Sequence, residues 1–308
     1  MEQLTGSAQA GLGAVAAKTA QPERLEKRSW LETFLFVSPG ALWQLVFGWY
    51  PIIAAFIITI LDYKVFGGSQ FVGVQNYIRM WQDPLTWTSI KLTYLYTVFS
   101  IVLTFIIPIV VAILLMEMPP RAVRIMMLLW FLPVSGMAFT ILWKYFYNVQ
   151  YGLMQSIMQA LHLPKQAFLS DPNKVMFWMI FPGIIMYGPG MIYLASLQSI
   201  PASLYEAAEV EGARFWRKLW TVTLPRIRPI IVMYMTFALI GTPQTFDWPY
   251  VLTGGGPGGA TRLVAIYIYE KYTQLRFSDA TVLAVFLFVL VMASVVLLRT
   301  FVKENPDE

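Results

Sequence analysis

Residues 206–229, EAAEVEGARFWRKLWTVTLPRIRP, form the longest charge-dense segment between two apolar blocks of the chain. Pro201 suits the first turn of a helix, because the amide that proline lacks would be unpaired there. Residues 203–211 are rich in helix formers, and Gly212 is the expected end of this helix. Residues 213–221 predict a second short helix, whose continuation Pro225 limits. A helix–glycine–helix elbow on the aqueous face of a membrane protein is suited to being gripped by another protein.

The composition indicates a membrane protein that crosses the bilayer several times. Of the 308 residues, 57% are hydrophobic and 13% are charged, whereas soluble domains carry about 25% charged residues. The chain has no cysteine, which excludes disulfides and thiolate metal sites. Its one histidine, His162, is expected to be a solvated loop residue, and no metal site is predicted. The net charge of +5 lies in loops, which favours a role in membrane orientation over nucleic-acid binding.

Long apolar runs predict an all-α fold with six membrane spans. The expected spans are residues 33–61, 90–116, 125–147, 175–198, 230–246 and 281–298. They make residues 29–308 one transmembrane domain, in which residues 199–229 form the loop between spans four and five. Residues 1–28 contain no apolar signal-peptide core and are expected to be a disordered cytoplasmic tail. Lys and Arg are more numerous on the side of the two termini and of residues 206–229, so the positive-inside rule predicts that this side is cytoplasmic.

The spacing of Glu206-Ala207-Ala208, Gly212-Ala213 and Leu224-Pro225 resembles the EAA loop of permease subunits of binding-protein-dependent ABC importers. Glu211 stands where that family has Asp, which is a conservative departure. Two further stretches resemble carbohydrate permeases, namely FVGVQNY at 71–77 and LTGGGP at 252–257 followed by Thr261. The resemblance implies a type I ABC importer permease of the maltose and glycerol-phosphate kind. It also implies a bacterial or archaeal cytoplasmic membrane as the location.

That resemblance implies the partners and the coupling residues. The partners would be a second homologous permease, two ATPase subunits that carry ATP and Mg, an extracytoplasmic sugar-binding protein and membrane lipid. The coupling residues would be Glu206, Ala207, Ala208, Glu211, Gly212, Leu224 and Pro225. In this interpretation Glu206 meets a basic group on the ATPase, the two alanines permit close approach, and Gly212 makes the turn. Alternatively, Glu206 only favours the helix N-terminus and the alanines are only helix formers.

Glycine and proline breaks in spans four and five are the best pointer to a substrate path, because exposed backbone groups in a membrane must line a cavity or be buried in protein. Polar and aromatic residues cluster there: Tyr187, Tyr193, Gln198, Thr242, Gln244 and Asp247. Sugars need ring faces for stacking, and amides or hydroxyls for hydrogen bonds. The alternative is that glycine and proline simply let membrane helices pack closely.

Other classes of function are disfavoured by the sequence. Gly254, Gly256 and Gly259 fit G-x-G-x-x-G, but Pro257 interrupts the segment and no βαβ unit surrounds it. The pattern G-x-x-x-x-G-K-[ST] is absent, so the chain is not expected to bind or hydrolyse ATP. An ion-coupled carrier would place ionisable groups within its spans, whereas Glu32, Asp62, Lys144 and Asp247 lie near span ends. A membrane enzyme would need a catalytic cluster, and the sequence offers none.

Overall fold

The computed structural model of the chain describes residues 30–131, 137–186 and 190–302. The chain divides into two compact units, Met1–Ala54 and Ala55–Glu308. The described part of the first unit is one helical run that comprises α2 (Trp30–Trp43), the π-helical turn η1 (Gln44–Trp49) and the start of α3 (Tyr50–Thr59). The run Glu32–Thr59 is long and apolar enough to cross a membrane. Apolar residues lie on all sides of this run, a pattern typical of a membrane-spanning helix.

The second unit is a helical bundle. In the part of the chain that the structure describes, its only strands form one short hairpin. Strands β1 (Leu61–Asp62) and β2 (Gln70–Phe71) pair antiparallel. The helices up to the middle of the chain are α4 (Gln75–Gln82), α5 (Pro84–Met116), α6 (Pro120–Phe131), α7 (Met137–Phe146), α8 (Leu153–Ala160), η2 (Phe168–Ser170) and α9 (Val175–Met186). They are followed by α10 (Met191–Gln198), α11 (Ala202–Val210), α12 (Phe215–Lys218), η3 (Leu219–Thr223), α13 (Leu224–Gly241), η4 (Thr242–Gln244), α14 (Asp247–Thr253), α15 (Val264–Thr273) and α16 (Phe277–Phe301).

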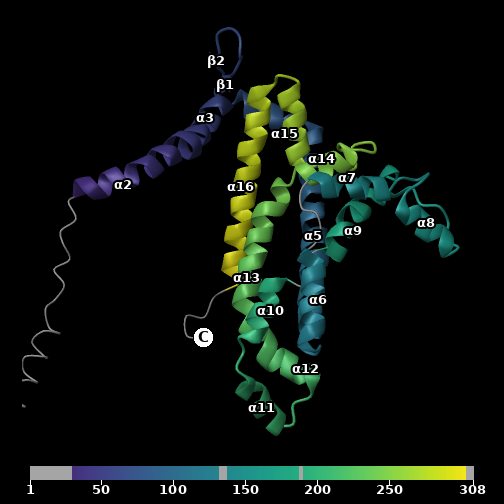
Figure 1. The fold of residues 1–308 in the computed structure, drawn as a ribbon. Coiled ribbons are helices and arrows are strands. Elements are labelled where there is room, and N and C mark those ends of the chain that lie inside the picture. Colours follow the sequence, from purple (N-terminus) through teal and green to yellow (C-terminus); the bar gives the residue numbers. More distant parts are fainter. Residues whose placement is uncertain (1–29, 132–136, 187–189, 303–308) are drawn as a thin grey trace, which may run out of the picture. The chain divides into compact units, whose positions relative to one another are not determined.

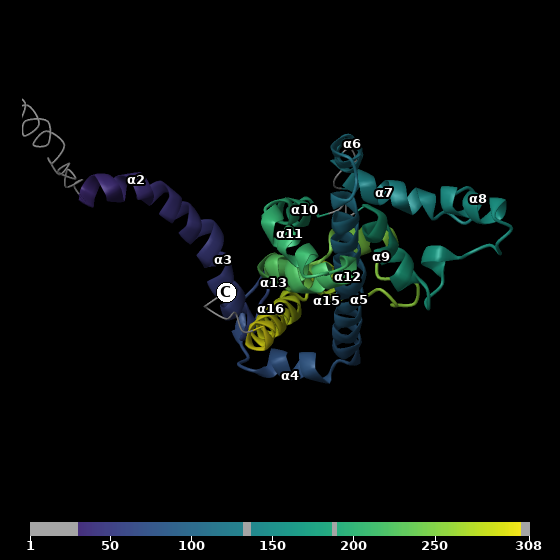
Figure 2. The same ribbon diagram turned by 90° about the horizontal axis from the view of Figure 1, so that it is seen from below.

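Helix α5 is the central element of this bundle, since it packs against α9, α10, α13 and α15. One core cluster joins α5, α7, α9 and α14 around Tyr96, Trp143 and Met179. A second cluster joins the other half of α5 to α10 and α13 around Ala112, Leu197 and Ile227. Helices α13 and α16 run side by side, and α7 and α8 project sideways from the bundle (Figure 1, Figure 2).

The helices differ from the predicted spans in their bounds. Among the described residues, four helices are long and apolar enough to cross a membrane: Glu32–Thr59, Pro84–Met116, Phe215–Gln244 and Phe277–Phe301. The second of these begins earlier than predicted, because Pro84 occupies the first helical turn and the Asp83 carboxylate accepts a hydrogen bond of 3.0 Å from the Leu85 amide. In the stretch predicted as span three the structure describes α6 and α7, and in the stretch predicted as span four it describes α9 and α10; residues 132–136 and 187–189 lie outside the described residues.

The predicted end of the second loop helix near Pro225 is wrong. The helix continues from Phe215 to Gln244 through the π-helical turn η3. In an unbroken α-helix the ring of Pro225 would clash with the carbonyl four residues earlier. The wider turn removes that conflict, and the Leu224 amide donates to the carbonyl of Leu219, five residues back.

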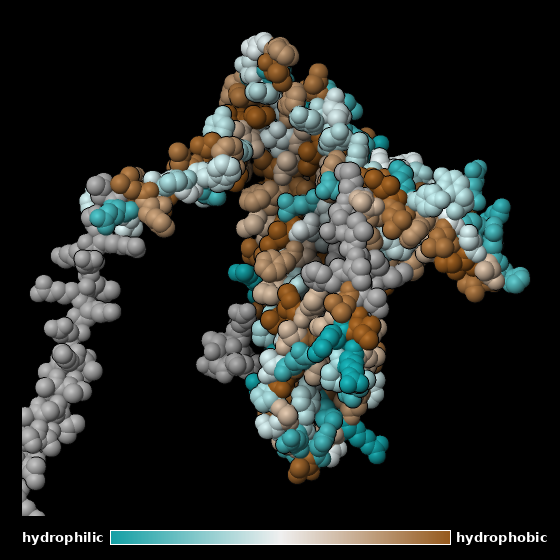
Figure 3. Space-filling model, in the orientation of Figure 1, coloured by the Kyte–Doolittle hydropathy of each residue, from teal (hydrophilic) through white to brown (hydrophobic). Residues whose placement is uncertain are grey.

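Side-chain polarity divides the surface of the second unit into zones. In Figure 3 brown apolar residues cover much of α13 and α16, and teal hydrophilic residues gather at the end formed by α11 and α12. The polar end therefore contains the loop that the sequence analysis singled out, at the edge of an apolar belt that suits the membrane interior.

Candidate coupling site

Helix α11 carries the EAA residues and ends at Gly212 as predicted. Its last turn is closed by hydrogen bonds of 2.9 Å from the Gly212 amide to the Glu209 carbonyl and from the Ala213 amide to the Ala208 carbonyl. Gly212 has a φ of +76°, which glycine adopts without the penalty that a Cβ brings. The chain then reverses, and Ala213 is buried under the elbow. The predicted glycine turn is therefore confirmed.

Two side-chain contacts hold α11 against the next helix. The Lys218 ammonium lies 2.7 Å from the Glu209 carboxylate. The Tyr205 hydroxyl lies 3.1 Å from the Thr223 hydroxyl, in the π-helical turn η3. The loop is therefore a fixed elbow with defined geometry.

The outward surface of α11 is free to meet another protein. Glu206, Ala207 and Glu211 are exposed, and Ala208 is half-buried. Glu206 has no ion-pair or hydrogen-bond partner among the residues that the structure describes. Val210, at the end of α11, is 91% exposed. The elbow therefore presents an exposed apolar side chain near the unpaired Glu206 carboxylate. A cleft with an apolar floor and a basic rim would complement this surface.

Leu224 and Pro225 complete the predicted motif at the base of the elbow. Leu224 packs against the core cluster of α5, α10 and α13, whereas Pro225 is exposed. These two residues therefore anchor and shape the helix that leaves the loop, and they lie apart from the outward surface of α11.

The predicted substrate-path residues fall into two groups, with Tyr187 outside the described residues. Tyr193 and Gln198 lie on α10. Tyr193 is buried, contacts the rings of Phe105 and Tyr234, and has a hydroxyl without a hydrogen-bond partner in the described structure. Gln198 is exposed. Five other buried side chains of the described structure also carry a polar atom without a partner, so this hydroxyl does not by itself distinguish Tyr193 as a ligand site.

The second group follows α13. Thr242 and Gln244 lie in η4, and Asp247 begins α14. Tyr193 meets α13 at Tyr234, and Thr242 is eight residues further on, a separation of about 12 Å along a helix. The described contacts thus place the two groups at different levels of α13.

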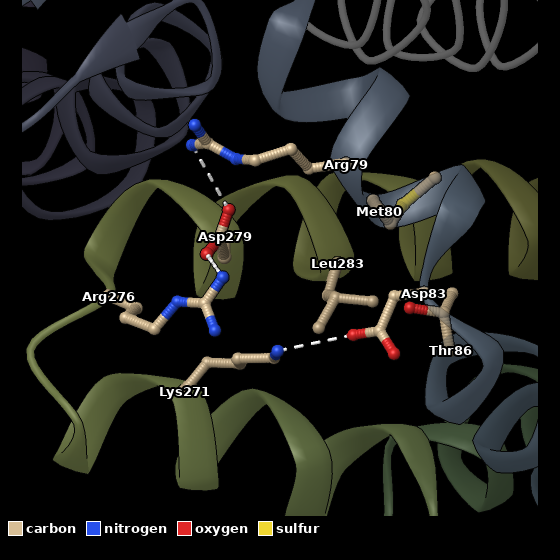
Figure 4. Close-up of a pocket in the computed structure, with 8 residues that line it drawn as sticks. All are labelled: Arg79, Met80, Asp83, Thr86, Lys271, Arg276, Asp279 and Leu283. Atoms are coloured by element: carbon tan, nitrogen blue, oxygen red, sulfur yellow. Dashed lines mark hydrogen bonds and ion pairs between the residues drawn. The ribbon is translucent and has the colours of Figure 1, made fainter.

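A partly buried charge cluster at the end of the bundle away from α11 was not predicted (Figure 1, Figure 4). The Asp83 carboxylate accepts hydrogen bonds from the Tyr267 hydroxyl and, at 3.2 Å, from the Lys271 ammonium. Asp279 lies 3.3 Å from Arg79 and 2.5 Å from Arg276. These contacts join the α4–α5 corner to α15 and α16.

The electrostatics of the cluster follow from its contacts. Burial disfavours the charge on Asp83, but hydrogen bonds from Tyr267, from the Leu85 amide and from Lys271 outweigh it and hold the pKa of this carboxyl below its ordinary value of 3.8. Burial and the neighbouring Asp83 charge raise the pKa of the Tyr267 hydroxyl. No local sequence signal could have found the Asp83–Lys271 and Arg79–Asp279 pairs, whose members lie 188 and 200 residues apart.

The two stretches that resemble carbohydrate permeases form turns that buried side-chain hydrogen bonds close. Asn76 is fully buried, and its amide donates to the carbonyls of Thr59 at 2.7 Å and Leu61 at 2.8 Å. Thr261 is also fully buried, and its hydroxyl lies 2.7 Å from both the Gly256 carbonyl and the Thr253 hydroxyl. Both residues close loops that join helices of the bundle.

Comparison with known proteins agrees with this architecture. The chain is 31% identical over 269 residues to the sulfoquinovosyl glycerol transport system permease protein of Agrobacterium fabrum, which covers 84% of this chain and 86% of that protein. It is 30% identical over 266 residues to the trehalose/maltose transport system permease protein of Thermococcus litoralis, with 84% and 90% covered.

Among solved structures, a chain of a bacterial alginate ABC transporter, crystallised with an alginate pentasaccharide-bound periplasmic protein, superposes with a TM-score of 0.77 at 22% identity. The match covers 91% of this chain and 98% of that one. This similarity shows a shared fold. Residues 89–304 match the family described as "Binding-protein-dependent transport system inner membrane component". The match spans most of the chain, and the chain therefore belongs to the family of inner membrane components of binding-protein-dependent transport systems.

Proposed function

We propose that this chain is the permease subunit of an ATP-driven importer that carries a carbohydrate across the cytoplasmic membrane. Family membership and the sugar transport permeases among its relatives support the substrate class. The observation that carries the proposal is the fixed elbow at the polar end of an apolar bundle, with Glu206 unpaired among the described residues and Val210 exposed.

In this proposal the chain works in a complex. It pairs with a second, homologous permease, and two ATPase subunits bind ATP and Mg and grip α11 of this chain. An extracytoplasmic binding protein delivers the sugar. ATP closes the ATPase pair, the elbows are drawn together, and the spans open outward to accept substrate. Glu206, Ala207, Ala208, Glu211 and Gly212 form the docking surface, while Leu224 and Pro225 set the direction of the helix behind it.

The experiment that tests the proposal is transport in proteoliposomes. The complete complex, supplied with binding protein and ATP, is expected to take up at least one of radiolabelled maltose, trehalose, lactose and an arabinan oligosaccharide. The chain alone is expected to take up none of them under a proton or sodium gradient. Gradient-driven uptake by the chain alone would refute the proposal and establish the ion-coupled carrier in its place.

The orientation belongs to the same proposal, with both termini and α11 in the cytoplasm and Thr253–Pro257 outside. The natural absence of cysteine makes labelling simple, because single-cysteine variants have no background. Gln274→Cys, which is exposed after α15, is expected to react with a membrane-impermeant maleimide in intact cells. Glu211→Cys is expected to react only after permeabilisation. The reverse pattern would overturn this orientation.

A further inference from the structure

The helix behind the elbow contains a π-helical turn where α11 touches it. Turn η3 spans Leu219–Thr223 and interrupts an otherwise α-helical run from Phe215 to Gln244. Such turns are rare within α-helices and recur at functional sites. Pro225 follows the turn directly, and the carbonyl four residues before it belongs to Thr221, inside the turn, so the sequence favours an irregular turn at this position.

Helix α11 contacts this turn through a shielded hydrogen bond. Thr223 is 6% exposed, and its hydroxyl lies 3.1 Å from that of Tyr205. The same hydroxyl lies 3.4 Å from the Lys218 carbonyl, at the start of the turn. Tyr205 therefore contacts a side chain whose hydroxyl also bonds to the backbone at the start of the wide turn.

The second contact between the two segments is more open to solvent. The side chains of Glu209 and Lys218, 2.7 Å apart, are 61% and 25% exposed. Exposed ion pairs contribute little, because water and salt screen them. Tyr205 and Glu209 are four residues apart and so lie on the same face of α11. The shielded bond is thus the stronger of two contacts that this face makes with the turn.

We infer that Tyr205 and Thr223 form the joint through which a displacement of α11 reaches α13. The inference rests on the proposed function, in which the ATPases move α11. Tyr205 directly precedes the exposed Glu206, so a force on the docking surface acts next to the joint. Thr223 directly precedes α13, so a change in the π turn alters the start of that helix. Both are positioning residues, since they act on the transport cycle through the helices they join.

The test measures coupling in the complete complex. Tyr205→Phe removes one hydroxyl, and Thr223→Val replaces the other by a methyl group of similar shape. Each variant is assembled with the ATPases and the second permease, and ATP hydrolysis is measured with and without binding protein loaded with whichever panel sugar the wild type transports. Thr221→Val is the matched control, because its hydroxyl bonds only within its own helix, to the Arg217 carbonyl at 2.7 Å. Tyr145→Phe, on the exposed face of α7, controls for the tyrosine change.

We expect both variants to recruit the ATPases normally and to retain basal hydrolysis. The stimulation by loaded binding protein should fall roughly five-fold, which corresponds to about 1 kcal/mol at 1.4 kcal/mol per tenfold change. The double variant should be no worse than the poorer single variant, since both remove the same bond. The controls should keep wild-type stimulation.

Three results would overturn the inference. These are unchanged stimulation in Tyr205→Phe, fully additive losses in the double variant, or a loss that comes only from failed ATPase recruitment. The last result would make the bond a support for the docking surface rather than a joint. A wild-type complex that transports no panel sugar and recruits no ATPase would instead refute the proposed function itself, and the joint with it.

Discussion

Replacing Asp83 by Asn should destabilise the bundle at the end that Figure 4 shows. The Asp83 and Lys271 side chains are 24% and 10% exposed, and their charged atoms lie 3.2 Å apart. At an effective dielectric constant of about 20, that separation gives a gross attraction of about 5 kcal/mol. Desolvation of both groups offsets part of it. We expect Asp83→Asn to lower the free energy of unfolding by about 2–3 kcal/mol, because Lys271 keeps a buried charge without its counter-ion.

Thermal unfolding in detergent, followed by tryptophan fluorescence, measures this loss. A fall in Tm of about 4–8 °C is expected. Asn retains an oxygen that can accept from the Leu85 amide, so the helix cap survives, while its amide group replaces the oxygen that accepts from Tyr267 and Lys271. Asp62→Asn is the matched control, since its partner Lys64 is 3.8 Å away and both side chains are well exposed. The double variant Asp83→Asn/Lys271→Met should recover most of the loss.

An unchanged Tm in Asp83→Asn, or an equal loss in Asp62→Asn, would refute this reasoning. The first result would mean that desolvation cancels the attraction. The second would mean that any removed carboxylate destabilises the chain, irrespective of burial.

Four further outcomes are expected. The pKa of the Asp83 carboxyl is lower in the folded chain than its ordinary value of 3.8. The stabilisation that the Asp83 charge gives the fold is therefore present above pH 3.8 and is lost as the pH falls through the folded pKa. Plotted against pH, the Tm values of wild type and Asp83→Asn should converge below about pH 4. Gly190→Ala should lower Tm, since its Cβ would lie 2.4 Å from the buried ring of Tyr193, a conflict of about 1–3 kcal/mol; an unchanged Tm would show that the ring moves freely. Asn76→Leu should cost about 2 kcal/mol or more in a urea titration, because two carbonyls lose their donor; a neutral result would mean that water replaces the amide. Gly212→Ala should lower the free energy of unfolding by about 1 kcal/mol. The cause is backbone strain alone, because the added Cβ would meet no atom within 4 Å. Asn tolerates positive φ better than Ala, so an equal or larger loss in Gly212→Asn would contradict strain as the cause.

Local signals in the sequence predicted much of the elbow and of the helical class. Helix formers before Gly212 predicted a helix that ends there, and the structure has both the helix and the positive φ. These features depend on residues within a few positions of one another. The docking role of Glu206 stays a prediction, because it depends on a partner surface that one chain does not contain.

The features that sequence reasoning missed depend on distant or competing contacts. Asp83 and Lys271 belong to no local motif, and only the fold brings them together. Pro225 predicts the end of a helix, but the helix continues past it because a wider, π-helical turn precedes the proline. Tyr205 and Thr223 lie beside and within the segment quoted first, yet nothing in their spacing indicated a contact across the elbow.

The unbroken run from Phe215 to Gln244 gives the molecule the geometry of a lever. It contains 30 residues, so it is about 45 Å long. The short arm is the segment before Pro225, about 15 Å long, and the long arm runs from Pro225 to Gln244, about 30 Å. A tilt of about 5° about Pro225 would move the end near α11 by about 1.3 Å and the far end by about 2.6 Å. A displacement at the elbow is therefore roughly doubled at the far end, in η4.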